Sequence, residues 1–222
     1  TGRLQFSSPT AGSTVAISAL PCTQLAIEMW PTEAIGIGAE TSIGLGATLD
    51  GLLGQKVSYN IHEFGLNARY RWFYGVRAHS PAFGLKLGVH GLVQFVQEQR
   101  PPVLLDRQLI GPELGAFFTY PIIPSRVWSR IEIRGGLPFF VRESPADSGD
   151  PRTFWSYGGR SEFAVRLTGR WYVQIMVDFR QQSVRFKGEG TRALGVEKVE
   201  TDDYFLSYSI GVRYAVPGLT GT

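Results

Sequence analysis

The segment that decides the fold is Asp203–Val216, which reads DYFLSYSIGVRYAV. Its even-numbered positions, from Tyr204 to Val216, are all aliphatic or aromatic. Its odd-numbered positions from Ser207 to Ala215 are small, polar or charged. Because successive side chains of a β-strand point to opposite faces, this pattern predicts a long strand with one apolar face and one polar face.

The same alternation recurs along most of the chain and predicts an all-β protein. We expect eight long antiparallel strands that run up and down, with ten strands as the alternative if the amino-terminal region adds two. The eight expected strands cover about residues 34–49, 60–74, 82–97, 107–120, 126–142, 154–168, 170–186 and 203–216. Longer connections are expected near 50–59, 98–106, 143–153 and 187–202, and shorter ones near 75–81, 121–125 and 168–170.

The composition restricts the class of protein. The chain has 222 residues with 27 Gly and a charged fraction of 18%, below the roughly 25% of soluble domains. The net charge of +3 is small, and acidic and basic residues are interleaved, so nucleic acid is not an expected partner. A single cysteine, Cys22, excludes an internal disulfide.

The polar face of the expected strands distinguishes two arrangements. In a transmembrane barrel the apolar face meets lipid and the polar face lines the interior; in a soluble barrel the polar face meets water. Here the polar face is rich in Gly, Ser, Arg and Glu, which suits a narrow interior where charges pair. The expected interior charge network consists of Glu40, Glu63, Arg69, Arg71, Lys86, Glu113, Arg130, Glu132, Arg134, Arg160, Glu162, Arg166, Asp178, Arg180 and Arg213.

Aromatic residues gather toward both ends of the expected strands, as in the two girdles at membrane–water interfaces. The alternative is that they are ordinary core residues. The girdle toward the short connections would contain Trp72, Tyr74, Phe83, Phe118, Tyr120, Trp171 and Tyr214. The girdle toward the long connections would contain Phe95, Phe139, Trp155, Tyr157, Phe179 and Tyr204.

With this pattern the chain resembles a bacterial outer-membrane β-barrel of the outer membrane protein A type. One motif is sharper: Ser209, Gly211, Tyr214 and Val216 match the polar, glycine and apolar positions of the barrel-assembly signal of such proteins. The chain departs from the family because residues 217–222 follow the signal, which usually ends the chain. The resemblance implies a location in the bacterial outer membrane.

The expected organisation has three parts. Residues 1–33 form an amino-terminal extension or the end of a periplasmic module, 34–216 form the barrel, and 217–222 form a short tail. Two short strands near 13–20 and 24–30 would give the ten-stranded alternative.

The sequence contains no recognisable catalytic motif, so we expect no enzyme, cofactor or metal site. Its three histidines are His62, His79 and His90. His62-Glu63 lacks the second histidine of a zinc helix, and no Gly-x-Ser-x-Gly sequence is present. His90 with Ser207 or Ser209 would suit a lipid-modifying enzyme, but packing in the interior is the simpler expectation.

We therefore expect a structural anchor or interaction subunit of an envelope complex, because an eight-stranded barrel is just wide enough for its own side chains. The alternatives are a barrel that transports a small solute and a lipid-modifying enzyme. The expected partners are the lipid bilayer, lipopolysaccharide, the outer-membrane assembly machinery and other envelope proteins.

Overall fold

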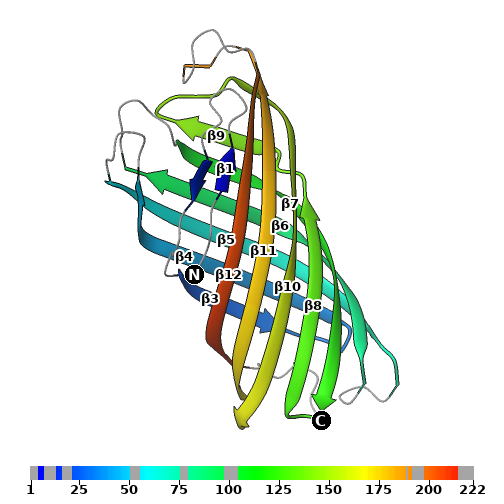
Figure 1. Cartoon of the computed structure of the whole chain (residues 1–222). Helices are drawn as coiled ribbons and strands as arrows, with labels where there is room; N and C mark the ends of the chain where they lie inside the picture. Colours follow the sequence, from blue (N-terminus) through cyan, green and yellow to red (C-terminus); the bar gives the residue numbers. More distant parts are fainter. Residues whose placement is uncertain are drawn as a thin grey trace.

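The computed structural model describes residues 5–7, 14–16, 22–50, 56–75, 80–97, 105–188, 190–191 and 198–214. These residues form one sheet of twelve strands (Figure 1). The strands are β1 (Gln5–Ser7), β2 (Thr14–Ala16), β3 (Cys22–Met29), β4 (Ile35–Asp50), β5 (Lys56–Phe73), β6 (Ala82–Val96), β7 (Asp106–Ile123), β8 (Val127–Gly136), β9 (Phe140–Ser144), β10 (Asp150–Thr168), β11 (Trp171–Lys187) and β12 (Lys198–Tyr214).

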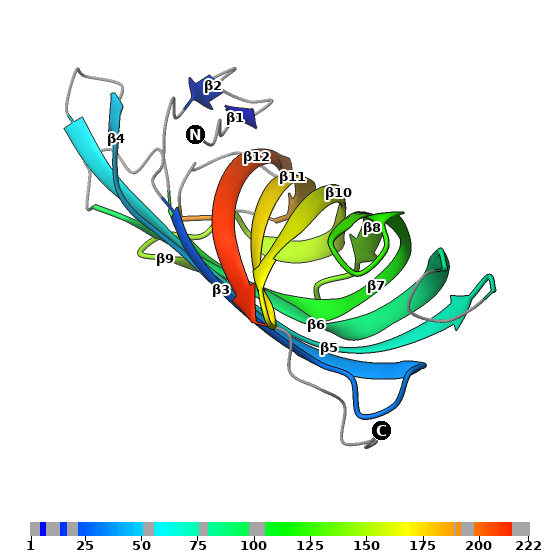
Figure 2. The ribbon, with the colours of Figure 1, turned by 90° about the horizontal axis from the view of Figure 1, so that it is seen from below.

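The sheet is antiparallel and its long strands follow one another up and down. The strand order is β2-β1-β12-β11-β10-β8-β7-β6-β5-β4-β3, and β9 pairs with the start of β7. Each strand is rotated relative to the next, so the sheet rolls into a half-barrel with a concave and a convex face (Figure 2). The predicted all-β, antiparallel, up-and-down fold is confirmed.

The strand β3, at one edge of the sheet, and β12, the last of the long strands, come within 8 Å of each other between Cα atoms. No ladder of backbone hydrogen bonds joins them in the described part of the chain. Farther along, the edge of β12 is occupied by β1, where Phe6 pairs with Asp203. On its other side, β3 pairs with β4. The ten-stranded alternative expected a strand near 24–30, and β3 lies there.

Side-chain burial alternates along the strands as the sequence pattern requires. In β5, the residues Asn67 and Arg69 are buried on the concave face, whereas their neighbours Leu66 and Tyr70 are exposed on the convex face. The same alternation places Lys86 of β6 on the concave face between the exposed Leu85 and Leu87. Polar groups are therefore buried and large apolar groups are exposed, which inverts the usual arrangement of a soluble protein.

The expected strand at 126–142 is divided into β8 and β9. Opposite β7, Glu113 pairs with Gly136 and Ile110 with Phe140, so the β8–β9 side contains one extra residue. Pro138 lies in the break, and a proline cannot donate a hydrogen bond to a ladder. Gly111 lies opposite this proline, and a Cβ added at Gly111 would lie only 2.3 Å from the Cα of Pro138. The absence of a side chain at Gly111 therefore allows the two backbones to approach closely.

The connection expected at 50–59 is shorter than predicted, because the ladder continues to the pair Asp50–Lys56. A register shift between Gly44 and Ala47 interrupts this ladder, and Gly46 adopts a φ of 75° there. Such a bulge redirects the strand without ending it. The connection after β4 covers residues 51–55 and the one after β5 covers residues 74–81. The prediction that the first of these is the longer one is therefore wrong.

The concave face is apolar toward the end of the sheet that carries the β4–β5, β6–β7 and β11–β12 connections, here called the loop end. Buried side chains from β5, β6, β7, β11 and β12 pack together there: Val57, Tyr59, Ile61, Leu92, Leu109, Val184, Phe186 and Val199. Charged side chains fill the middle of the concave face. The opposite end carries the β5–β6, β7–β8 and β10–β11 turns and is called the short-turn end.

Phe117 of β7 is buried on the concave face and lies over Gly84 of β6. A Cβ added at Gly84 would lie 2.2 Å from the Phe117 ring and 2.6 Å from the carbonyl oxygen of Tyr70. Both distances are far below van der Waals contact, so only glycine leaves room for this ring.

We expect Gly84→Ala to lower the free energy of unfolding by about 1–3 kcal/mol, the usual effect of overpacking. Denaturant titration followed by tryptophan fluorescence measures this value. Gly135→Ala is the matched control, because a Cβ there meets its nearest neighbour at an ordinary 3.6 Å. Equal stability of the two variants would contradict the packing of Phe117 on Gly84.

Candidate functional site

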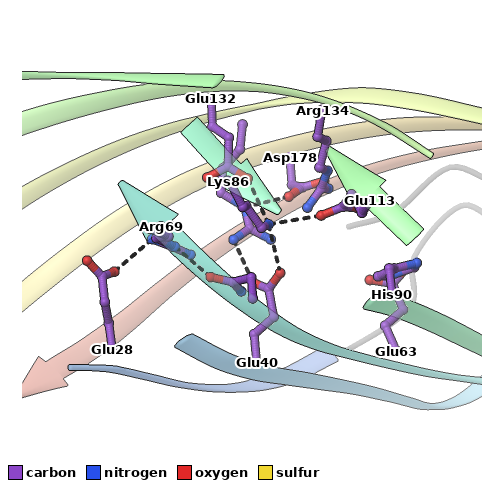
Figure 3. A network of polar contacts seen from close by, with 12 residues as sticks. Glu28, Glu40, Glu63, Arg69, Lys86, His90, Glu113, Glu132, Arg134 and Asp178 are labelled. Atoms are coloured by element: carbon purple, nitrogen blue, oxygen red, sulfur yellow. Dashed lines mark hydrogen bonds and ion pairs between the residues drawn. The ribbon is translucent and has the colours of Figure 1, made fainter. Parts of the chain in front are cut away.

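The most unusual feature of the concave face is a buried lysine surrounded by three carboxylates. Lys86 is 2% exposed, and its Nζ lies 2.9 Å from Glu113, 2.9 Å from Glu132 and 3.6 Å from Glu40 (Figure 3). The four residues come from β6, β7, β8 and β4, so the curvature of the sheet brings them together. Since a buried ammonium must be paired and hydrogen-bonded, this contact ties four strands to one point.

Arginines extend this cluster across the half-barrel. Arg160 of β10 pairs with Glu40 at 2.7 Å and with Asp178 at 2.7 Å, and Arg134 also binds Asp178. Arg180 of β11 lies 3.4 Å from Glu113 and 3.6 Å from Glu63. We call these residues the central group: Glu40, Glu63, Lys86, Glu113, Glu132, Arg134, Arg160, Asp178 and Arg180.

A second set of ion pairs lies toward the short-turn end and is called the mouth group: Glu28, Arg69, Arg130 and Glu162. Glu28 of β3 accepts hydrogen bonds from Arg69 at 2.9 Å and from Arg130 at 3.1 Å. Arg130 also lies 3.9 Å from Glu162. The buried Phe117 ring lies beside this group, with the Arg130 guanidinium 5.2 Å and the Arg69 guanidinium 6.0 Å from its centroid.

A third set lies toward the loop end. Arg107 of β7 pairs with Asp203 of β12 at 2.7 Å and with Glu143 of β9 at 2.9 Å. All three side chains are almost fully buried. Along the half-barrel the interior therefore contains the mouth group, the central group and then, toward the loop end, the apolar cluster with the Arg107 pairs among its members.

Two expected members of the network, Arg166 and Arg71, are placed differently, and the placement of a third, Arg213, is not tested. Arg166 is exposed at the short-turn end and donates to the carbonyl oxygens of Gly169 and Ser125. Arg71 also lies at that end, stacked over Trp30 and donating to the carbonyl oxygen of Glu33. Both alternate correctly along their strands, but they stand at the rim, where turn carbonyls accept hydrogen bonds from them. Arg213 pairs with Tyr172 in the β11–β12 ladder, and its side chain lies outside the described residues.

Sequence reasoning missed four charged residues of the interior: Glu28, Arg107, Glu143 and Asp203. Glu28 was assigned to the amino-terminal extension, and the other three to strand ends or connections. The alternation of Glu28 with the apolar Ile27 and Met29 was the available signal. Asn67, which accepts a hydrogen bond from Arg69 Nε at 2.7 Å, is a further buried polar residue of the interior.

The convex face carries the apolar side chains of all the long strands. Leu66, Ile133 and Ile210 are 65%, 64% and 79% exposed at positions within β5, β8 and β12. The other exposed aliphatic residues of this face include Leu25, Ile27, Ile35, Ile37, Leu85, Leu87, Leu114, Ile131, Leu167, Ile175 and Val212. This surface extends around the half-barrel from β3 to β12.

Several of the residues assigned to the girdles lie side by side on neighbouring strands. Toward the short-turn end, Trp72 pairs in register with Phe83, and Phe83 with Phe118. The Trp72 and Phe83 rings stack at 5.8 Å, and Tyr74, Tyr120 and Trp171 of the same girdle are exposed. Toward the loop end, Tyr157 stacks on Trp155 at 5.2 Å and contacts Phe179 at 6.2 Å. Phe95 and Phe139 are exposed and Tyr204 is half-buried; the side chain of Tyr214 lies outside the described residues.

The expected assembly signal lies in β12. Ser209 and Gly211 face the concave side opposite Met176 and Gln174 of β11. The backbone of Tyr214 pairs with Trp171. Val216 and the tail at 217–222 lie outside the described residues.

The described residues contain no group of three His, Cys, Asp or Glu side chains placed to hold a metal ion. His90 contacts the Arg180 guanidinium on the concave face. Among the described residues, no helix is long and apolar enough to cross a membrane. Comparison with known proteins finds no family model and no curated protein that matches the chain.

We expect Lys86→Met to lower the free energy of unfolding by about 3–5 kcal/mol, because three buried carboxylates lose a shared cation. Arg185→Met is the matched control. Arg185 pairs with Glu200 at 2.8 Å on the exposed surface, and such pairs contribute little. Denaturant titration of both variants gives the comparison, and a Lys86→Met protein as stable as the control would refute the role assigned to the central group.

Proposed function

We propose that this chain is an outer-membrane β-barrel that serves as an anchor or interaction subunit in a bacterial cell envelope. The observation that carries the proposal is the inverted burial of the strands, with paired charges on the concave face and large apolar side chains exposed on the convex face. Soluble monomers rarely expose apolar patches beyond a few hundred Å². A hydrocarbon environment removes the cost of exposing this surface.

The proposed environment also explains the aromatic rows. Amphipathic rings favour the headgroup level of a membrane, and the rows at Trp72–Phe83–Phe118 and Trp155–Tyr157 lie toward opposite ends of the strands. Lipid and lipopolysaccharide are then the contacts of the convex face. The β12 motif supports recognition by the outer-membrane assembly machinery.

The filled interior favours an anchor over a transport barrel or a lipid-modifying enzyme. Side chains of the central group reach across the half-barrel and bind one another, and the Phe117 ring and the apolar cluster fill the space at either side. A continuous aqueous path would have to cross both charged and apolar layers. The exposed β7–β8 and β10–β11 turns remain as surfaces for other envelope proteins.

The convex face gives a direct test of the membrane environment. We expect Ile133→Arg to lower the stability of the protein folded in lipid vesicles by about 2–4 kcal/mol, the range for a cation near the bilayer midplane. Ile133→Leu is the control and should be nearly neutral. If the protein instead folds as a detergent-free soluble monomer and tolerates Ile133→Arg, the membrane proposal is wrong.

Conductance in a planar bilayer separates an anchor from a pore. We expect the purified protein to insert without steady ion conductance, because its interior is filled. The same recording on Phe117→Ala tests whether removing the buried ring opens a path past the mouth group. Stable unitary conductance of the unchanged protein, with a selectivity altered by Glu132→Gln, would establish the transport alternative.

A further inference from the structure

A cavity of about 440 Å³ opens at the short-turn end of the half-barrel. It is lined by the residues that follow β3, by the turn ends of β5 to β8, and by the facing ends of β10 and β11. The mouth group forms its inner wall, since Glu28 and Arg130 line it. The anchor role proposed above makes no use of this cavity.

One wall of the cavity is held rigidly. Trp30 rests on Gly36, where a Cβ would lie only 2.8 Å from the indole ring. The Trp30 Nε1 also donates to Glu28 at 2.6 Å. These two contacts fix the plane of the ring, so Trp30 is a platform with a defined orientation.

The platform orients an arginine. The Arg71 guanidinium lies 3.7 Å from the centroid of Trp30 and 4.8 Å from that of Phe73. Its Nε donates to the carbonyl oxygen of Glu33 at 2.6 Å. An arginine held against two rings loses little further freedom when it binds an anion, which favours binding.

Further cations and hydroxyl groups converge on the same cavity. Arg126 and Arg166 line its outer part, and Ser80, Thr119 and Ser125 contribute to the lining. Two carboxylates are present, Glu28 and Glu33, and Glu28 already accepts hydrogen bonds from Arg69, Arg130 and Trp30. The lining therefore contains two carboxylates and four arginines, namely Arg71, Arg126, Arg130 and Arg166. The cavity is basic.

We propose that this mouth cavity binds a phosphate group, with Arg71, Arg126 and Arg166 as the groups that recognise it. Guanidinium groups match the geometry of phosphate oxygens through paired hydrogen bonds. The phosphate belongs either to a soluble phosphate ester or to the headgroup of an anionic phospholipid at the membrane edge. Both sources present the same chemistry to the arginines.

The test uses the full chain, folded in a neutral detergent, with two probes. Glycerol 3-phosphate represents the soluble source, and micelles doped with phosphatidylglycerol represent the lipid source, with phosphatidylcholine as the zwitterionic control. Calorimetry gives the affinity, and the fluorescence of Trp30 and Trp128, which both line the cavity, reports occupancy. Saturation by one probe alone identifies the source, and saturation by both supports the shared phosphate chemistry.

Charge-matched variants locate the site. The pair Arg126→Gln and Arg166→Gln should weaken binding by about tenfold or more, because charge-assisted hydrogen bonds are lost. The pair Arg142→Gln and Arg185→Gln removes the same charge from exposed positions toward the loop end and should leave the affinity within about twofold. If the first pair fails to fold, Arg126→Gln alone and the cavity-filling Ser80→Trp replace it, because the Arg126 side chain makes no polar contact among the described residues.

Two results would overturn the phosphate site: no saturable binding of either probe, or equal weakening by the two arginine pairs, which would indicate nonspecific attraction. Neither result affects the proposed membrane location. That proposal is tested separately by Ile133→Arg on the convex face.

Discussion

The pairing of Lys86 with Glu40, Glu113 and Glu132 is the interaction on which the rest of the structure depends. A flat sheet cannot bring β4, β6, β7 and β8 to one ammonium group, because Glu40 lies two strands from Lys86 on one side and Glu132 two strands away on the other. Charge pairing in the interior and curvature of the sheet therefore require each other. Glycine on the concave face also makes the filled interior possible, since Gly84 leaves room for the Phe117 ring beside the charged residues.

The alternation of residue types predicted the elements well because burial follows a period of two over much of β5, β6 and β7, although it is interrupted elsewhere, as in β11, where Arg180–Val184 are all buried. Seven of the expected strands correspond to one observed strand each, β4 to β7 and β10 to β12, and the exposed apolar positions are those that the pattern assigned to one face. The break between β8 and β9 was not predicted, although Pro138 was visible. A proline in a strand indicates an edge or a bulge, and the decision depends on whether the opposite residue is as small as Gly111.

The ion-pair partner of each charged residue was harder to predict than the face of the sheet on which the residue lies. Alternation states that Arg180 and Glu113 point inward, but which carboxylate each cation pairs with depends on register across several strands. Asp203 joins Arg107 only because β12 curls back toward β7, which no local pattern reveals. Arg71 and Arg166 illustrate the limit at strand ends: an inward position near a turn also meets backbone carbonyls, which no alternation predicts.

The membrane proposal places a demand on the two edges of the sheet. Unpaired backbone groups are costly in hydrocarbon, which is why spanning sheets close into barrels. A cavity of about 300 Å³ lies between β3 and β12. Leu25 and Ile210 line it, and so do the charged interior residues Glu28 and Arg160. Pairing of Cys22–Met29 with the end of β12 would satisfy both edges. It would also join Leu25 and Ile27 to Ile210 and Val212 in one apolar surface, and it would seal the charged interior from lipid. The short strand β3, which carries Glu28 into the mouth group, is thus the element whose pairing decides between an open half-barrel and a closed barrel.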